Sequence, residues 1–141
     1  MIIAVDFDGT IVDHQYPEIG SLVPGAVEWL KAMQEVGAKL ILWTIRCDSE
    51  SSGPVLSDAV AFCRKHGIEF DGINVNPTQH TWSLSPKAYA NIYIDDAAFG
   101  CPLRANTRSG GRPFVDWDII GATVLDMLKD QKQHGEQKVE V

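Results

Sequence analysis

Short apolar runs of strand length recur along the chain, and most of them end abruptly in polar residues. The first run is rich in β-branched residues and stops at Asp6, the second stops at Thr44, and the last stops at Asp95. Apolar runs this short, without alternation, are typical of strands buried on both faces of a parallel sheet. The strands are predicted over residues 1–5, 39–44, 72–75 and 90–94.

Apolar residues at helical spacing predict helices over residues 24–36, 54–66 and 117–129. Gly37 and Gly67 suit the positions just after the first two helices, and Asp116 is a candidate cap for the third. Strands that alternate with helices in this order predict an α/β fold of the Rossmann-like, three-layer type. The sheet is expected to be mostly parallel, with helices on both faces.

Length and charge narrow the class of protein. The 141 residues fit one domain, predicted over residues 1–130, with a polar tail over 131–141. The formal net charge of −7 provides no positive field for a nucleic acid. No apolar run approaches the roughly 20 residues of a membrane span, and no basic segment precedes the first apolar run. A cytoplasmic protein without nucleic-acid or membrane partners is expected.

Asp6 and Asp8 stand two residues apart where the first strand ends. In an extended backbone their carboxylates project to the same side, where they repel each other unless a cation lies between them. Oxygen ligands with open positions favour Mg²⁺. The alternative is that Asp8-Gly9 is the turn of a β-hairpin, because Asp-Gly between apolar runs is a strong hairpin signal.

Further polar residues end or border the other strands. Thr44 closes the second, Lys87 precedes the last, and Asp95-Asp96 closes it. On a parallel sheet these groups meet Asp6 and Asp8 at one edge. A phosphoryl group is a suitable ligand for such a site. A cation held by the carboxylates and the ammonium group of Lys87 would neutralise its oxygens, and the Thr44 hydroxyl would donate a hydrogen bond to one of them.

These residues resemble the sequence motifs of the haloacid dehalogenase (HAD) superfamily of phosphohydrolases. Residues 6–11, Asp-Phe-Asp-Gly-Thr-Ile, resemble motif I, and residues 40–44 resemble motif II. Lys87 matches the motif III lysine, and residues 92–96, Ile-Tyr-Ile-Asp-Asp, resemble motif IV. The motifs occur in the expected order and together span about two-thirds of the chain.

The resemblance implies a phosphatase that hydrolyses a phosphomonoester through an aspartyl-phosphate. Asp6 would be the nucleophile and Asp8 the general acid and base, with Thr44 and Lys87 binding the phosphoryl group. Mg²⁺ would be held by Asp6, by the backbone carbonyl of Asp8, and by Asp95 or Asp96; the sequence does not distinguish the last two.

In this family, cap domains that select the substrate are inserted after motif I or between motifs II and III. Each of these segments here has room for little more than one predicted helix. The chain therefore resembles the small capless members of the family. An open site of this kind is covered by a large substrate or by a second subunit, so a homo-oligomer is one expectation.

Other residues near the motifs allow two interpretations. Arg46 is either a clamp for phosphate or a carboxylate of the substrate, or a solvated loop residue. Arg104, Arg108 and Arg112 form either an anion-binding lip or a mobile surface loop. His14 lies in the segment after motif I, which should border the entrance, and no catalytic role is expected for it.

Two non-hydrolytic functions compete with the phosphatase. A phosphoryl-accepting receiver module also combines acids, Thr and Lys on a parallel sheet, but its phosphoacceptor follows the third strand, where this chain has Asn74 and Asn76. A ligand-binding module on the same fold is the other. The presence of every motif residue favours the enzyme.

Overall fold

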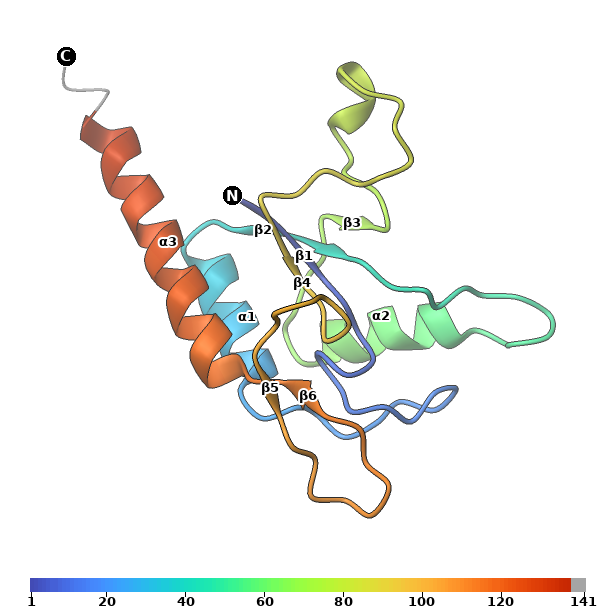
Figure 1. Ribbon diagram of the computed structural model, residues 1–141. Coiled ribbons are helices and arrows are strands. Elements are labelled where there is room, and N and C mark those ends of the chain that lie inside the picture. The colour runs from blue at the N-terminus through green and yellow to red at the C-terminus, as the bar shows by residue number, and fades with distance from the viewer. Residues whose placement is uncertain (138–141) are drawn as a thin grey trace.

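The structure, a computed structural model, describes residues 1–137 and contains a four-stranded parallel sheet (Figure 1). The strands lie in the order β3-β2-β1-β4, and every neighbouring pair is parallel. Their bounds are β1 Ile2–Val5, β2 Lys39–Leu42, β3 Gly72–Ile73 and β4 Ile92–Ile94. The predicted strands and their parallel pairing are confirmed, although each strand is shorter than predicted.

The helices are α1 (Ala26–Glu35), α2 (Val55–Lys65) and α3 (Trp117–Gln137). Gly37 and Gly67 follow α1 and α2 with φ of +94° and +82°, a left-handed conformation that glycine adopts without steric cost. The Asp116 carboxylate accepts a hydrogen bond of 3.2 Å from the Asp118 N–H, so this predicted cap of α3 is confirmed.

Helix α3 is longer than predicted. Residues 131–137 of the predicted tail are helical, and residues 138–141 lie outside the described part of the chain. Gln and Lys favour helix even where no apolar stripe remains, so the helix continues beyond its packed part. Among the described residues, no helix combines the length and the apolar character that a membrane crossing requires.

The three α-helices of the described chain contribute to one core on a single face of the sheet. The chain moves from β1 to β2 to β3 in one direction, so right-handed crossovers place α1 and α2 on the same side. Helix α3 packs against α1 on that side. The core includes Ile3, Val5, Leu40, Leu42, Leu30, Met33, Ala59, Cys63, Val124 and Leu128. The expectation of helices on both faces is therefore corrected.

The opposite face carries a smaller apolar cluster formed by Ala4, Ile41 and Ala90, with Ile2 and Trp43 packed against it. The chain returns from β3 to β4 through residues 74–91, which contain the single-turn 3₁₀ helix η1 (Gln79–Thr81) and no α-helix. Figure 1 shows this segment away from α1 and α3. The second covering layer is thus a loop, which leaves the carboxyl ends of the strands open.

A short antiparallel ribbon, which was not predicted, follows the sheet. It consists of β5 (Leu103–Arg104) and β6 (Phe114–Val115). The Val115 N–H donates a hydrogen bond of 3.0 Å to the Gly9 carbonyl, and the Trp117 indole donates one of 2.7 Å to the Thr10 carbonyl. These contacts fix the ribbon beside the loop that follows β1.

Candidate active site

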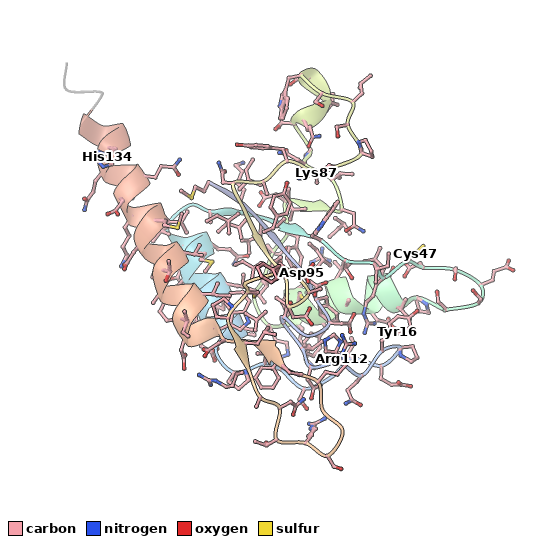
Figure 2. All side chains as sticks on the ribbon, viewed as in Figure 1. Tyr16, Cys47, Lys87, Asp95, Arg112 and His134 are labelled. Carbon is pink, nitrogen blue, oxygen red and sulfur yellow. The ribbon has the colours of Figure 1, made fainter. Side chains whose placement is uncertain are left out.

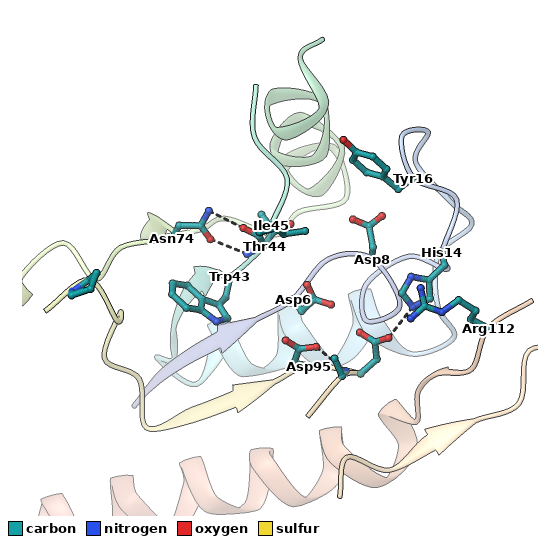
Figure 3. A pocket seen from close by; sticks show the side chains of 13 residues that line it. Asp6, Asp8, His14, Tyr16, Trp43, Thr44, Ile45, Asn74, Asp95 and Arg112 are labelled. Atoms are coloured by element: carbon teal, nitrogen blue, oxygen red, sulfur yellow. Dashed lines mark hydrogen bonds and ion pairs between the residues drawn. The ribbon is translucent and has the colours of Figure 1, made fainter. Parts of the chain in front are cut away.

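The carboxyl ends of β1 and β4 bring together the side chains of Asp6, Asp95 and Asp96. Figure 3 shows Asp6 beside Asp95. The strands are neighbours with Val5 opposite Ile94, and the Asp6 N–H donates a hydrogen bond of 2.9 Å to the Ile94 carbonyl. One carboxylate oxygen of each aspartate lies within 4.8 Å of the others. The predicted convergence of these three residues therefore occurs.

Burial and the neighbouring carboxyl groups raise the pKa of Asp6 from 3.8 to about 8. Burial is the largest cause, followed by the charge of Asp95 and by a hydrogen bond with the Asp96 carboxyl group. The Thr10 hydroxyl also donates a hydrogen bond of 3.1 Å to Asp6 Oδ2. Three carboxylates so close together need a proton or a cation, and an all-oxygen donor set fits a hard divalent ion such as Mg²⁺.

The loop after β1 is a tight turn that is not part of a β-hairpin. Strand β1 pairs only with β2 and β4, both parallel, which removes the hairpin interpretation of Asp8-Gly9. Gly9 has φ of +84°, and a Cβ atom there would collide with His14 and Asp96. A glycine is required at this position because the backbone passes directly beneath the acidic cluster.

His14 lies in the site, closer than its predicted place at the entrance. Its Nε2 atom is 2.8 Å from Asp96 Oδ2, and it lines the same cavity as the acids. The contact fixes the orientation of the Asp96 carboxylate. The only sequence signal for this role is the position of His14 shortly after motif I, and spacing alone does not reveal the contact.

Asp8 also lines the cavity, but both of its carboxylate oxygens face Arg46. Arg46 Nε donates to Asp8 Oδ2 at 2.8 Å, and Arg46 Nη2 donates to Asp8 Oδ1 at 2.7 Å. The arginine is only 2% exposed. Its guanidinium group also donates to the backbone carbonyls of Pro17, Glu18 and Val55.

Both interpretations of Arg46 are therefore corrected. The residue is neither solvated nor a clamp for the substrate, because its donors are used inside the protein. It joins Asp8 to the segment after motif I and to the start of α2. The rings of Phe7 and Tyr16 lie 4.9 and 5.1 Å from the guanidinium carbon and enclose it further.

Thr44 lies at the cavity just beyond β2, where Asn74 holds its backbone. The Thr44 N–H donates to Asn74 Oδ1 at 2.8 Å, and Asn74 Nδ2 donates to the Thr44 carbonyl at 2.9 Å. Asn74 has φ of +56°, a strained conformation that asparagine tolerates better than most residues. The Thr44 hydroxyl accepts a hydrogen bond from the Arg46 N–H, which leaves its proton for an acceptor in the cavity.

Lys87 does not join these groups. Its side chain is exposed and does not line the cavity, and Nζ lies 5.4 Å from the centre of the Tyr93 ring. Figure 2 shows Lys87 well separated from Asp95. The expected place of Lys87 beside Asp6 and Thr44 is therefore corrected: the loop over residues 74–91 directs this side chain towards Tyr93 on β4.

The arginines near the ribbon separate into paired and unpaired side chains. Arg104 pairs with Asp116 and Asp118 at 3.2 and 2.9 Å. Arg108 pairs with Asp13 at 3.3 Å and also donates to the Ser21 hydroxyl. Arg112 lines the cavity and forms no ion pair with any carboxylate of residues 1–137.

The cavity lined by Asp6, Thr44 and Arg112 has a volume of about 940 Å³. Apolar side chains form much of its wall: Trp43, Ile45 and Tyr16, of which Ile45 is 96% and Tyr16 55% exposed. Such a volume greatly exceeds that of a phosphate ion. The cavity therefore has room for an organic group beside any anion held at the acidic cluster.

The chain is similar to a conserved protein from Bacteroides thetaiotaomicron of known structure. The two are 41% identical over 90% of this chain and 91% of the other, with a TM-score of 0.67. This chain belongs to the same family. The description of the Bacteroides protein names no activity. No protein-family model matches the sequence, and no curated protein does so either.

Proposed function

We propose that the protein is a Mg²⁺-dependent phosphomonoester hydrolase of the HAD type without a cap domain. The observation that carries this proposal is the convergence of Asp6, Asp95 and Asp96 at the ends of two neighbouring parallel strands. Thr44 follows the strand on the other side of β1 and lines the same cavity. The motif resemblance predicts this arrangement, and the segments between the motifs contain no additional domain.

The residues present fit a Mg²⁺ site. Asp6, Asp95 and Asp96 supply carboxylate oxygens, and the Asp8 backbone carbonyl is the predicted fourth ligand. When bound, the cation would neutralise phosphoryl oxygens and the charge that develops on them. Its positive charge would also favour the ionised form of Asp6, whose pKa is raised by burial and by the neighbouring carboxylates.

In the proposed reaction, an Asp6 oxygen attacks phosphorus in line with the bond to the leaving alcohol. The Asp8 carboxyl group gives its proton to the departing oxygen, and an aspartyl-phosphate on Asp6 results. A water molecule then attacks that phosphorus and gives a proton to Asp8. Inorganic phosphate leaves and the Asp6 carboxylate is restored. The Thr44 hydroxyl donates to a phosphoryl oxygen throughout.

A second candidate is a ligand-binding or phosphoryl-accepting module that does not turn over. The observation in its favour is the pairing of both Asp8 oxygens with Arg46. If that pairing persists with substrate bound, Asp8 cannot transfer protons efficiently. Such a module would bind a phosphate ester, or remain phosphorylated, without releasing inorganic phosphate.

Hydrolysis of phenyl phosphate and of a panel of biological phosphomonoesters distinguishes the two candidates. If the protein is a phosphatase, it should release inorganic phosphate in the presence of Mg²⁺, and the release should stop when the metal is chelated. Stoichiometric phosphorylation of Asp6 without release of phosphate would support the accepting module. No metal-dependent release from any ester would contradict the phosphatase.

The effect of Mg²⁺ on stability should depend strongly on pH. Because the folded-state pKa of Asp6 is near 8 and the unfolded value near 3.8, this group lowers the stability of the metal-free protein progressively between those values. A cation must displace the proton below pH 8, so Mg²⁺ affinity should be roughly 100-fold weaker at pH 6 than at pH 8.5. Accordingly, the Mg²⁺-induced rise in Tm should be small at pH 6 and large at pH 8.5.

Scanning calorimetry with and without Mg²⁺ at the two pH values measures this effect. In Asp6→Asn the titrating carboxyl group is absent, so any remaining Mg²⁺ effect should vary much less with pH. An equal rise in Tm at both pH values in the wild-type protein would show that Asp6 does not exchange a proton for the cation.

A further inference from the structure

Positive charge at the cavity comes from one of the three arginines near the ribbon rather than from Lys87 or Arg46. Lys87 lies outside the cavity, and the donors of Arg46 are used by Asp8 and backbone carbonyls. Among the residues of the described chain that line the cavity, Arg112 is the one lysine or arginine. It comes from the loop between β5 and β6, outside all the recognised motifs.

The ribbon holds this loop against the site. Val115, three residues after Arg112, donates a hydrogen bond to the Gly9 carbonyl at 3.0 Å. On the other side of the loop, Arg108 pairs with the buried Asp13. The chain is therefore anchored to the segment that follows β1 both before and after Arg112, and these anchors direct Arg112 to the cavity.

Arg112 is free to bind a ligand although acids lie nearby. No carboxylate of residues 1–137 lies within ion-pair distance of its guanidinium group. Asp96 instead contacts His14, and Asp8 contacts Arg46. An unpaired guanidinium at the wall of a cavity is a strong site for an anion, with a fork of donors that matches a carboxylate or phosphate.

Its position points to a part of the ligand other than the reacting phosphoryl group. Figure 3 shows Arg112 beside His14, on the opposite side of Asp6 from Trp43, with Thr44 on the Trp43 side. A phosphoryl group held between Asp6 and Thr44 would leave Arg112 beyond Asp6. Thr44 and Arg112 line the same cavity of about 940 Å³, so a second group of the same ligand has room to reach the exposed Arg112 side chain.

We propose that Arg112 is a specificity residue that binds a second anionic group, carried on the leaving alcohol of the phosphomonoester. The preferred substrates are then phosphomonoesters with a carboxylate or a further phosphate, rather than esters of neutral alcohols. This inference rests on the proposed function, whose phosphoryl site it extends. It also explains how an acidic cavity attracts a ligand with several negative charges.

Matched ester pairs test the proposal. Glycerol 3-phosphate has a hydroxymethyl group at the position where 3-phosphoglycerate has a carboxylate. Phenyl phosphate and 4-carboxyphenyl phosphate form a second pair. Wild-type protein should show a KM about tenfold lower for each carboxylated ester, the effect expected of one charge-assisted contact. Arg112→Ala should abolish this preference and change kcat/KM for the neutral esters less than about twofold.

Arg104→Ala is the matched control, because it removes the same charge from the same ribbon outside the cavity. It should keep the preference for carboxylated esters. If Arg112→Ala weakens both members of a pair equally, Arg112 contacts the phosphoryl group and the proposal is wrong. If it weakens neither, or if the wild-type protein shows no preference, the proposal is wrong as well.

Calorimetric titration separates this inference from the proposed function. It measures binding of both esters in the presence of Mg²⁺ and requires no turnover. Preferential binding of 3-phosphoglycerate that is lost in Arg112→Ala, without hydrolysis of either ester, would support the inference and contradict the phosphatase. Hydrolysis of both esters without any preference that depends on Arg112 would support the phosphatase and contradict the inference about Arg112.

Discussion

Replacing Asp6 by asparagine should reduce phosphate release by roughly 10⁴-fold or more, the scale seen when a catalytic nucleophile is removed. The asparagine amide has no anionic oxygen with which to attack phosphorus, and it is a poorer ligand for Mg²⁺. Phosphate release from phenyl phosphate in the presence of Mg²⁺ measures the loss. The acid-stable phosphoryl group that the substrate transfers to Asp6 should also be absent from the variant.

The folded state should tolerate this substitution. The amide oxygen can still accept the hydrogen bond from Thr10, and the substitution removes a carboxylate whose ionisation is opposed by burial and by repulsion from Asp95. The metal-free variant should therefore have a higher Tm than the wild-type protein at pH 8. Asp126→Asn, an exposed position on α3, is the control and should retain full activity. Substantial activity in Asp6→Asn would exclude Asp6 as the nucleophile.

Replacing Arg46 by methionine should lower the free energy of unfolding by about 3–5 kcal/mol, the range found when one partner of a buried ion pair is removed. Methionine keeps much of the length of the side chain but supplies no donors. The Asp8 carboxylate and the carbonyls of Pro17, Glu18 and Val55 would lose their hydrogen bonds. Urea-induced unfolding measures the change.

Two controls show whether the loss comes from the buried contacts. Arg64→Met breaks a pair with Glu69 in which both side chains are about two-thirds exposed, and it should cost less than about 1 kcal/mol. In an Asp8→Asn background, Arg46→Met should cost less than it does alone, because no partly buried carboxylate is then left unpaired. Equal costs for Arg46→Met and Arg64→Met would contradict the structural role of Arg46.

The sequence predicts the sheet and the acidic cluster well because both follow from short-range signals. Apolar runs identify the strands, and parallel strands bring their carboxyl ends to one edge whatever the details of packing. Asp6, Asp95 and Asp96 lie directly beyond two such strands, so their convergence needs no further information. Thr44 follows from the same reasoning.

The parts that the sequence does not predict depend on long-range packing. Arg46 follows a strand end just as Thr44 does, and only the folded chain shows that it turns inward to Asp8. Lys87 has the expected spacing, but spacing does not determine the direction of a loop side chain. Strands β5 and β6 have two residues each, too few for any periodicity, so the sequence does not show which of Arg104, Arg108 and Arg112 reaches the cavity.

The central claim is that Asp6, Asp95 and Asp96 share one divalent cation. Anomalous diffraction from crystals soaked in Mn²⁺, an ion that prefers the same oxygen ligands as Mg²⁺, tests it most directly. One strong peak is expected about 2.0–2.3 Å from a carboxylate oxygen of Asp6 and from one of Asp95 or Asp96. Crystals at pH 8.5 with no peak among these carboxylates, or with Mn²⁺ bound only elsewhere, would contradict it.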